Sequence, residues 1–195
     1  MVSIPDSKTD AAGELVPTIH SAEIRHAASQ FVTGVTIVTI RDEDGTPLGL
    51  TANSFTMVSL DPPLVLVCLD KQLGSYPAFQ VSRVYAVHVL AEDQADLSTR
   101  FAMKGEDKFR GLRWREGLEG VPILPDYLAL WECRIVHAYD GGDHTIAVAR
   151  VERVELGDLR RQPLGFFRSA YIQVHRHPGA YVPEEVIELW GLGWA

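Results

Sequence analysis

Apolar and polar residues alternate over several short segments of this chain, a period-two pattern that predicts β-strands. Residues 35–40 carry β-branched side chains on both faces, residues 42–45 supply a turn, and residues 48–50 bring the chain back. Further strands are predicted at residues 64–69, 84–90, 128–138, 145–156, 164–167 and 170–174. The last two are expected to close the sheet, and a compact turn is expected to join the two long ones.

Two segments have helical periodicity. Ser21 is the expected N-cap of the first, in which apolar residues recur at i, i+3, i+4 and i+7 from Ile24 to Phe31. The apolar face of this helix is expected to pack against a sheet. The second helix is predicted over residues 92–103. About seven strands in hairpin-like succession, with two helices, predict a mainly β protein: a Greek-key-like antiparallel barrel, closed or nearly closed, with peripheral helices.

The chain divides into three parts by its patterning. Residues 1–18 lack periodicity and are predicted to be a flexible N-terminal arm, residues 19–178 form one domain, and residues 179–195 form a C-terminal tail. Residues 104–124, with mixed charge and frequent glycines, are predicted to be a surface excursion. Residues 51–63 break the strand pattern and are predicted to be a polar connection between strands.

Composition narrows the class of protein. The 195 residues are 46% hydrophobic and 23% charged, as expected for one soluble globular domain. A formal net charge of −8 argues against nucleic acid as the main partner. The sequence shows neither a signal-peptide pattern nor an apolar run of about 20 residues, so no membrane association and a cytoplasmic location are expected. Cys68 and Cys133 both lie in apolar runs and are expected to be buried structural thiols.

Candidate chemistry is sparse. The chain lacks a Gly-x-Ser-x-Gly elbow, a phosphate-binding loop ending in Gly-Lys-Ser/Thr and a Gly-x-Gly-x-x-Gly fingerprint. His175 and His177 would share one face of a strand, but two exposed polar residues are the favoured interpretation, so no metal site is predicted. His88 interrupts an apolar strand and is expected to be a hydrogen-bonded core or interface histidine. His144 follows Gly-Gly-Asp at a tight turn, where its ring can face a cleft.

The polar stretch at 51–63 has two interpretations on its own. Its hydroxyls and amides could serve only as a connection between buried strands, or they could hold an anion such as phosphate. Its joint occurrence with other short motifs favours the second. Those motifs, in chain order, are Phe31-x-x-Gly34-Val35, Gly49-x-Thr51-Ala52-Asn53-Ser54-Phe55, Ser59-x-x-Pro62-Pro63-Leu64, Ala86-x-x-x-Leu90, Arg100-Phe101, Lys108-Phe109, Gly142-Asp143-His144 and Pro163-Leu164 ahead of Tyr171. Over about residues 21–175 this order resembles the short-chain flavin reductase family, the reductase components of two-component flavin monooxygenases.

The resemblance implies a split β-barrel that forms homodimers, with flavin bound near the subunit interface. The positions that it assigns to flavin are Thr51, Ala52, Asn53, Ser54, Ser59, Leu60, Lys71, Ser75, Arg100 and Phe101. Lys71 and Ser75 match positions that face the flavin phosphate and ribityl chain, and the Arg100 guanidinium suits the phosphate. His144 and Tyr171, the latter in the segment 167–171, match the nicotinamide side. His88 stands where Asn is more usual in the family.

The resemblance also implies a function: an NAD(P)H:flavin oxidoreductase that passes a hydride from NADH or NADPH to FMN or FAD. Reduced flavin would then go to a partner monooxygenase. Hydride transfer of this kind needs stacked, aligned rings and preorganised donors but no protein acid, base or nucleophile, so no catalytic side chain is predicted. Two alternatives remain open: a split-barrel module that binds flavin without turnover, and an FMN-dependent oxidase of the pyridoxamine-phosphate oxidase type.

Overall fold

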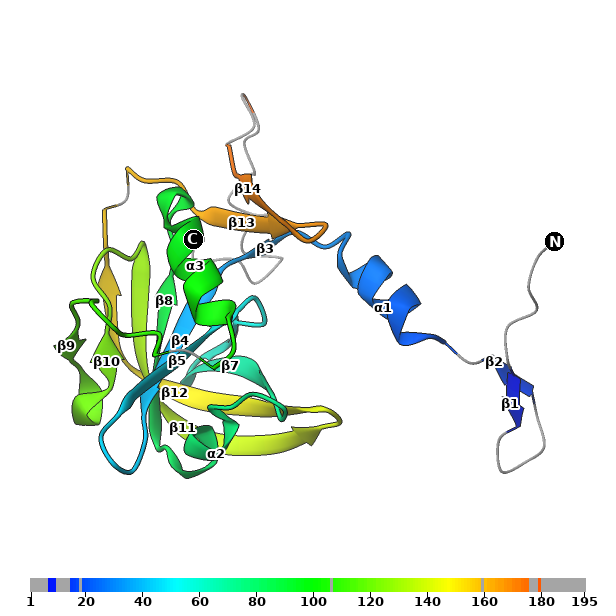
Figure 1. Cartoon of the computed structure of the whole chain (residues 1–195), viewed down its shortest axis with the longest axis horizontal. Coiled ribbons are helices and arrows are strands. Elements are labelled where there is room, and N and C mark those ends of the chain that lie inside the picture. The colour runs from blue at the N-terminus through cyan, green and yellow to red at the C-terminus, as the bar shows by residue number, and fades with distance from the viewer. Residues whose placement is uncertain are drawn as a thin grey trace.

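The core of the fold is a seven-stranded antiparallel sheet (Figure 1). The computed structural model describes residues 7–9, 15–17, 19–105, 107–158, 160–175 and 179. In spatial order the strands are β5 (Pro47–Ala52), β4 (Thr36–Arg41), β8 (Val84–Val89), β11 (Ala129–Gly141), β12 (His144–Leu156), β7 (Pro63–Asp70) and β6 (Thr56–Leu60). The prediction of a mainly β, antiparallel fold with peripheral helices is confirmed. Register shifts in the β11–β12 pair, after Glu132 and after Ile135, mark bulges that bend these long strands.

A second, three-stranded sheet has the order β14-β13-β3, with strands β3 (Thr33–Gly34), β13 (Leu164–Phe167) and β14 (Ala170–Gln173). The prediction that the last two strands close the main sheet is therefore wrong. Instead, β13 pairs with β3, a segment just before β4, with Gly165 opposite Gly34, and β14 pairs with the other edge of β13. The β13–β14 turn has two residues, Arg168 and Ser169, with φ of 47° and 63°. Such a mirror-image turn matches the twist of a hairpin, but it places two non-glycine residues in a left-handed conformation.

The helical elements are α1 (Ser21–Ala28), α2 (Tyr76–Val81), η1 (Glu92–Gln94), α3 (Ala95–Ala102) and η2 (Leu118–Gly120). The helix predicted over residues 92–103 is confirmed as η1 followed by α3. The helix α3 lies across one end of the main sheet, beside β4 and β5 and below β13 (Figure 1). Phe101, on the inner face of α3, is fully buried and packs edge-on against Phe109. In the described part of the chain, no helix is long and apolar enough to cross a membrane, and the cytoplasmic location stays a prediction.

The helix α1 differs from the sequence prediction. Its N-cap is His20 rather than Ser21, and the His20 amide donates to the Glu23 carboxylate at 2.9 Å. None of its residues is buried, and it stands apart from the sheets (Figure 1). The prediction that its apolar face packs against a sheet of the same chain is therefore wrong. Preceding it, β1 (Ser7–Thr9) pairs with β2 (Leu15–Pro17), a short hairpin within the segment for which no regular pattern was predicted.

Two segments that the sequence predicted to be irregular connections contain regular secondary structure. The polar stretch at 51–63 contains the end of β5 and all of β6, whose alternating exposure is that of an edge strand. Its turn into β7 includes a cis Asp61–Pro62 bond. Residues 104–124 contain η2, β9 (Arg115–Glu116) and β10 (Pro122–Ile123). They also bury Phe109 and Val121, so they cover part of the core rather than only the surface.

The structure confirms two predictions about buried residues: His88 is a hydrogen-bonded core histidine, and Cys133 is a buried thiol. His88 is 1% exposed; its Nδ1–H donates to the Ile37 carbonyl and its Nε2 accepts from the Leu124 amide, each at 3.1 Å. Cys133 is buried as predicted, but Cys68 is only half-buried, so the prediction of a buried thiol is wrong for Cys68; both are free thiols. Burial raises the pKa of Cys133 to about 12, so this thiol is inert at neutral pH.

Candidate functional site

A cavity of about 510 Å³ lies between the start of β5, the β7–α2 loop and the end of α3. We call it the α3 cavity; residues 46–49, 72–75, 102–105 and 107–108 line it. Leu48, Leu73 and Met103 give it apolar walls, while Ser75 and two lysines, Lys104 and Lys108, add a hydroxyl and positive charge. An apolar slot with hydroxyl and cationic groups is suited to a planar ligand that carries an anionic group.

Gly49 and Lys108 explain how the α3 cavity is held together. A Cβ at Gly49 would lie 2.7 Å from the Phe101 ring and 3.0 Å from the Val38 carbonyl, so β5 can approach α3 only without a side chain there. The Lys108 ammonium donates to the Gly49 carbonyl at 3.1 Å and to the Phe101 carbonyl at 2.6 Å. These bonds join β5 to the C-terminal end of α3. Partial burial lowers the pKa of Lys108 below its usual value.

A second hollow, of about 610 Å³, lies next to the turn after β5. We call it the Phe31 groove; residues 28, 31–36, 53–56 and 89 line it. Asn53 is exposed on its wall. The Ser54 hydroxyl donates to the Cys68 carbonyl at 3.2 Å and accepts from the Cys68 amide at 3.0 Å, which fixes the turn against β7. In the same wall, the buried Thr33 hydroxyl lacks a hydrogen-bond partner among the described residues.

Thr51 and Tyr171 meet at one residue of α3. The Thr51 hydroxyl donates to the Ser98 carbonyl at 2.6 Å, and the Tyr171 hydroxyl donates to Ser98 Oγ at 2.8 Å. The structure therefore brings together one residue predicted for the flavin side and one predicted for the nicotinamide side. The Thr51 hydroxyl proton is already used within the protein.

Lys71 and His144 lie at the β11–β12 turn. The Lys71 ammonium is paired with Asp140 and donates to the Gly142 carbonyl at 2.6 Å, while the Lys71 amide donates to the Asp143 carbonyl at 3.0 Å. The hydrogen bond to Asp140 raises the pKa of Lys71. His144 Nδ1 donates to Asp143 at 2.7 Å, which lowers the pKa of that carboxyl. Lys71 thus fastens the turn that carries His144.

The other residues predicted to bind flavin are buried, already hydrogen-bonded within the chain, or distant from the turn after β5. Arg100 donates to the Arg110 carbonyl, and Phe101 is fully buried, so only its main chain can face a ligand. Ala52 is also buried, and its carbonyl accepts from the Thr36 hydroxyl at 2.7 Å. Ser59 and Leu60 lie at the far end of β6 from Ser54, and Leu60 is 61% exposed.

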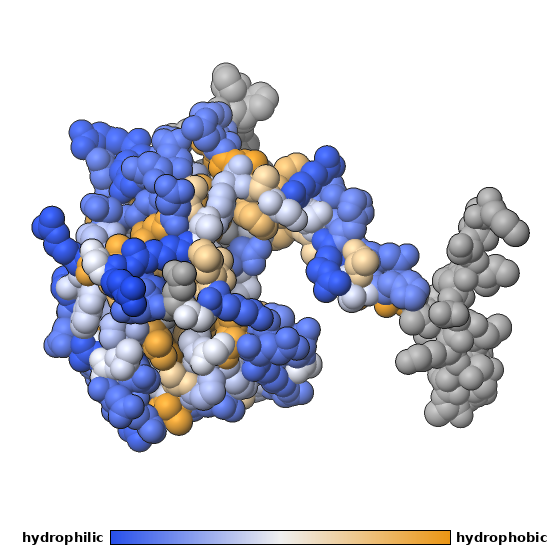
Figure 2. Space-filling model, in the orientation of Figure 1, coloured by the Kyte–Doolittle hydropathy of each residue, from blue (hydrophilic) through white to orange (hydrophobic). Residues whose placement is uncertain are grey.

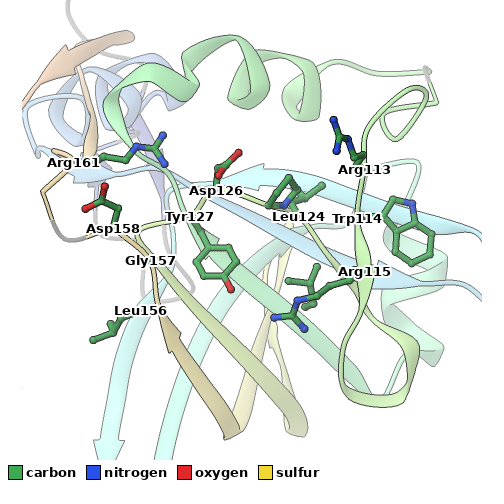
Figure 3. Close-up of a pocket in the computed structure, with 12 residues that line it drawn as sticks. Arg113, Trp114, Arg115, Leu124, Asp126, Tyr127, Leu156, Gly157, Asp158 and Arg161 are labelled. Carbon is green, nitrogen blue, oxygen red and sulfur yellow. The ribbon is translucent and has the colours of Figure 1, made fainter.

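A third cavity lies at the opposite end of β12 from His144 and contains none of the residues predicted for the site (Figure 3). It measures about 420 Å³, and Trp114, Tyr127 and Leu156 contribute apolar surface. Two of its arginines already have carboxylate partners: Arg115 pairs with Glu155 and Arg161 with Asp93. We therefore place the candidate site at the α3 cavity and the Phe31 groove.

Sequence reasoning missed two groups of lining residues. Residues 46–49, 102–105 and 107–108 border the α3 cavity, and residues 31–36 border the Phe31 groove. The sequence held a partial signal for both groups of lining residues. Phe31, Gly49 and Lys108 occur in the family motifs, but the residues alone gave these three no role. In the described ranges, no cluster of three or more His, Cys, Asp or Glu side chains could hold a metal ion; His177 lies outside those ranges.

The antiparallel sheet, its strand order and the position of α3 make this a split β-barrel fold. The sequence model described as "Flavin reductase like domain" matches residues 28–175, and the chain belongs to that family.

Similar proteins are known in several bacteria. The NADH-dependent FMN reductase SmoA of Agrobacterium fabrum is 45% identical over 78% of this chain and 85% of its own length. The reductase subunit HsaB of a flavin-dependent monooxygenase from Rhodococcus jostii is 41% identical over 85% of this chain and 83% of its own. Among solved structures, an NADH:FAD oxidoreductase of Streptomyces globisporus in complex with NAD and FAD fragments superposes with a TM-score of 0.73 at 35% identity, over 82% of this chain and 94% of that one.

Some relatives are considerably longer. The chain spans 47% of the length of a Rhizobium meliloti relative that is 45% identical to it, and 47% of the length of one from Acinetobacter baylyi that is 40% identical.

Proposed function

We propose that this protein is an NAD(P)H:flavin oxidoreductase that supplies reduced flavin to a partner monooxygenase. The proposal rests on the α3 cavity, which has apolar walls and two lysines, in a chain that belongs to the flavin reductase like domain family. Relatives with names of this function include an NADH-dependent FMN reductase and an NADH:FAD oxidoreductase. FMN and FAD are therefore both candidate substrates, and NADH is the favoured donor.

The residues around the cavity fit a flavin. Leu48, Leu73 and Met103 offer an apolar surface for an aromatic ring system, and Ser75 with Lys104 suits a phosphate. When bound, the flavin supplies the ring that accepts the hydride; the protein residues bind it, orient it and exclude water. His144 and Tyr171 are proposed to position the nicotinamide.

We also propose a homodimer in which a second copy covers α1 and the Phe31 groove. Ile24, Phe31 and Val32 are 57%, 75% and 50% exposed. Exposing several large apolar side chains in one region is unfavourable for a monomer in water. Figure 2 shows hydrophobic residues gathered where α1 leaves the body of the domain, near β3 and β13. Asn53 lies on the same groove, so a second copy there would border the proposed flavin site.

A steady-state assay tests the function. Purified protein is mixed with NADH or NADPH and with FMN or FAD, and the loss of reduced-nicotinamide absorbance is followed for the four combinations. We expect oxidation well above the enzyme-free rate with at least one pair. No oxidation with any pair would overturn the proposal, and a bound flavin that neither donor reduces would indicate the non-catalytic binding module instead.

Asn53→Ala tests the placement of the flavin. Because Asn53 is exposed on the groove wall and carries no described hydrogen bond within the chain, its loss should leave the fold intact. We expect the flavin dissociation constant to rise about fivefold to tenfold, the equivalent of one hydrogen bond. Glu43→Ala, at an exposed position of the β4–β5 turn that lines neither cavity, is the control that should leave binding unchanged. An unaltered dissociation constant in Asn53→Ala would remove Asn53 from the site.

A further inference from the structure

Ser98, in the middle of α3, connects two of the residues predicted for the site, which belong to different sheets. It is fully buried. Its carbonyl accepts from the Thr51 hydroxyl of β5 in the seven-stranded sheet, and its own hydroxyl oxygen accepts from Tyr171 of β14 in the three-stranded sheet. A carbonyl has two lone pairs, so the Thr51 bond adds to the helix hydrogen bond rather than replacing it.

The strand β14 has few other attachments. It is an edge strand that pairs only with β13, and three of its four residues are exposed. In the part of the chain that the structure describes, its hydrogen bonds to elements other than β13 come from the Tyr171 hydroxyl. Of the two acceptors, Ser98 Oγ at 2.8 Å is nearer than Thr99 Oγ1 at 3.3 Å, and the Thr99 hydroxyl already donates to the Ala95 carbonyl. Ser98 is thus the main anchor of this strand.

We propose that Ser98 is a positioning residue: it fixes the Tyr171 segment relative to the Thr51–Ser54 turn, and so sets how the nicotinamide stacks on the flavin. The inference rests on the proposed function. Stacked hydride transfer is sensitive to misplacement of about 1 Å, so a loose β14 reduces the rate without preventing flavin binding. Ser98 itself touches neither ring; it acts through Tyr171 and Thr51.

The kinetic test compares Ser98→Ala, Tyr171→Phe and the double variant with the wild type. We expect Ser98→Ala to lower kcat/KM for the nicotinamide about tenfold and to change the flavin dissociation constant less than about twofold. Both substitutions remove the same hydrogen bond, the one between the Tyr171 hydroxyl and Ser98 Oγ. The double variant should therefore be no slower than Tyr171→Phe alone. Thr39→Val is the matched control: it removes another fully buried hydroxyl, which donates to the Pro122 carbonyl, and should leave kcat/KM unchanged. Additive losses, or an equal loss in Thr39→Val, would overturn the inference.

Hydrogen–deuterium exchange gives a readout that needs no activity. The amides of β14 should exchange about tenfold faster in Ser98→Ala and in Tyr171→Phe than in the wild type, and those of β8 should not change. Equal exchange of β14 in all three proteins overturns the anchoring role of Ser98. A wild type that oxidises no reduced nicotinamide overturns the proposed function instead, and the exchange result still decides the anchoring role.

Discussion

At the scale of single residues, His88 illustrates how a polar side chain is accommodated in this core. Its two ring nitrogens have different partners, a carbonyl that needs a donor and an amide that needs an acceptor. Only the neutral ring with a proton on Nδ1 satisfies both, and a second proton would face the Leu124 amide. Burial, with a smaller contribution from the charge of Arg115, lowers the pKa of His88 to about 4.

This pKa makes stability depend on pH. The unfolded ring takes a proton near pH 6.5 and the folded ring near pH 4, so the unfolded state binds more protons between these values and stability is lost as pH falls through them. We expect the free energy of unfolding to fall by about 2 kcal/mol between pH 7 and pH 5 from this residue alone. Urea denaturation at the two pH values measures the difference.

His88→Gln is the variant to compare in that experiment. Whatever its stability at pH 7, it should lose about 2 kcal/mol less than the wild type between pH 7 and pH 5, because the titrating ring is gone. The same loss in both proteins would contradict the assignment of the pH dependence to His88.

At the scale of elements, the close approach of β5 and α3 depends on the absence of a side chain at Gly49. The buried Phe101 ring fills the space in which a Cβ would stand. The Lys108 ammonium then bridges the main chains of both elements. A flexible neighbour could yield to an extra methyl group, but Phe101 is held by Phe109 on its other side.

Gly49→Ala should therefore destabilise the fold by about 1–3 kcal/mol through overpacking. The matched control is Gly74→Ala in the wall of the same cavity, where an added Cβ meets no atom within 4 Å. Its stability should stay within about 0.5 kcal/mol of the wild type. Chemical denaturation curves of the two variants give the comparison; equal stabilities would show that α3 can move away from β5.

The elements also show what the sequence could and could not predict. Strands β4, β5, β7, β8, β11 and β12 and the helix α3 follow directly from local periodicity, because each has one or two buried faces. The strand β6 was missed because its outward residues at the sheet edge weaken the pattern. The partner of β13 was misjudged because no local signal indicates that residues 33–34 form a strand across from residues 165–166. Of the residues that line the α3 cavity, only Ser75 was among the predicted site residues, because residues such as Lys108 reach the cavity through tertiary contacts.

At the scale of the whole molecule, the position of α1 is the main unexpected feature. The amphipathic pattern was read correctly, but among the described residues no surface buries the apolar face of α1. Sequence periodicity indicates that a face is to be buried and does not identify the surface that buries it. The exposed apolar residues near α1 are consistent with the proposed homodimer.

Phe31→Asp tests that assembly. Burying a carboxylate without a partner opposes association, so we expect the variant to elute as a monomer where the wild type is a dimer, by size-exclusion chromatography with light scattering. Val81→Asp is the control: Val81 is 53% exposed at the end of α2, away from α1, and this variant should remain dimeric. A monomeric wild type, or a dimeric Phe31→Asp protein, would contradict the proposal.

The strand order has a consequence for how the chain reaches this state. The strand β12 lies between β11 and β7, and Val67 pairs with Ala147, 80 residues later. During synthesis, the β6–β7 hairpin therefore emerges long before the strand that it needs, while the β4–β5 pair needs only β8 to continue the sheet. Contacts so distant in sequence slow folding, because a long loop must close before they form. The apolar run of β7 is thus exposed until β12 leaves the ribosome, and it is the segment most in need of protection on the nascent chain.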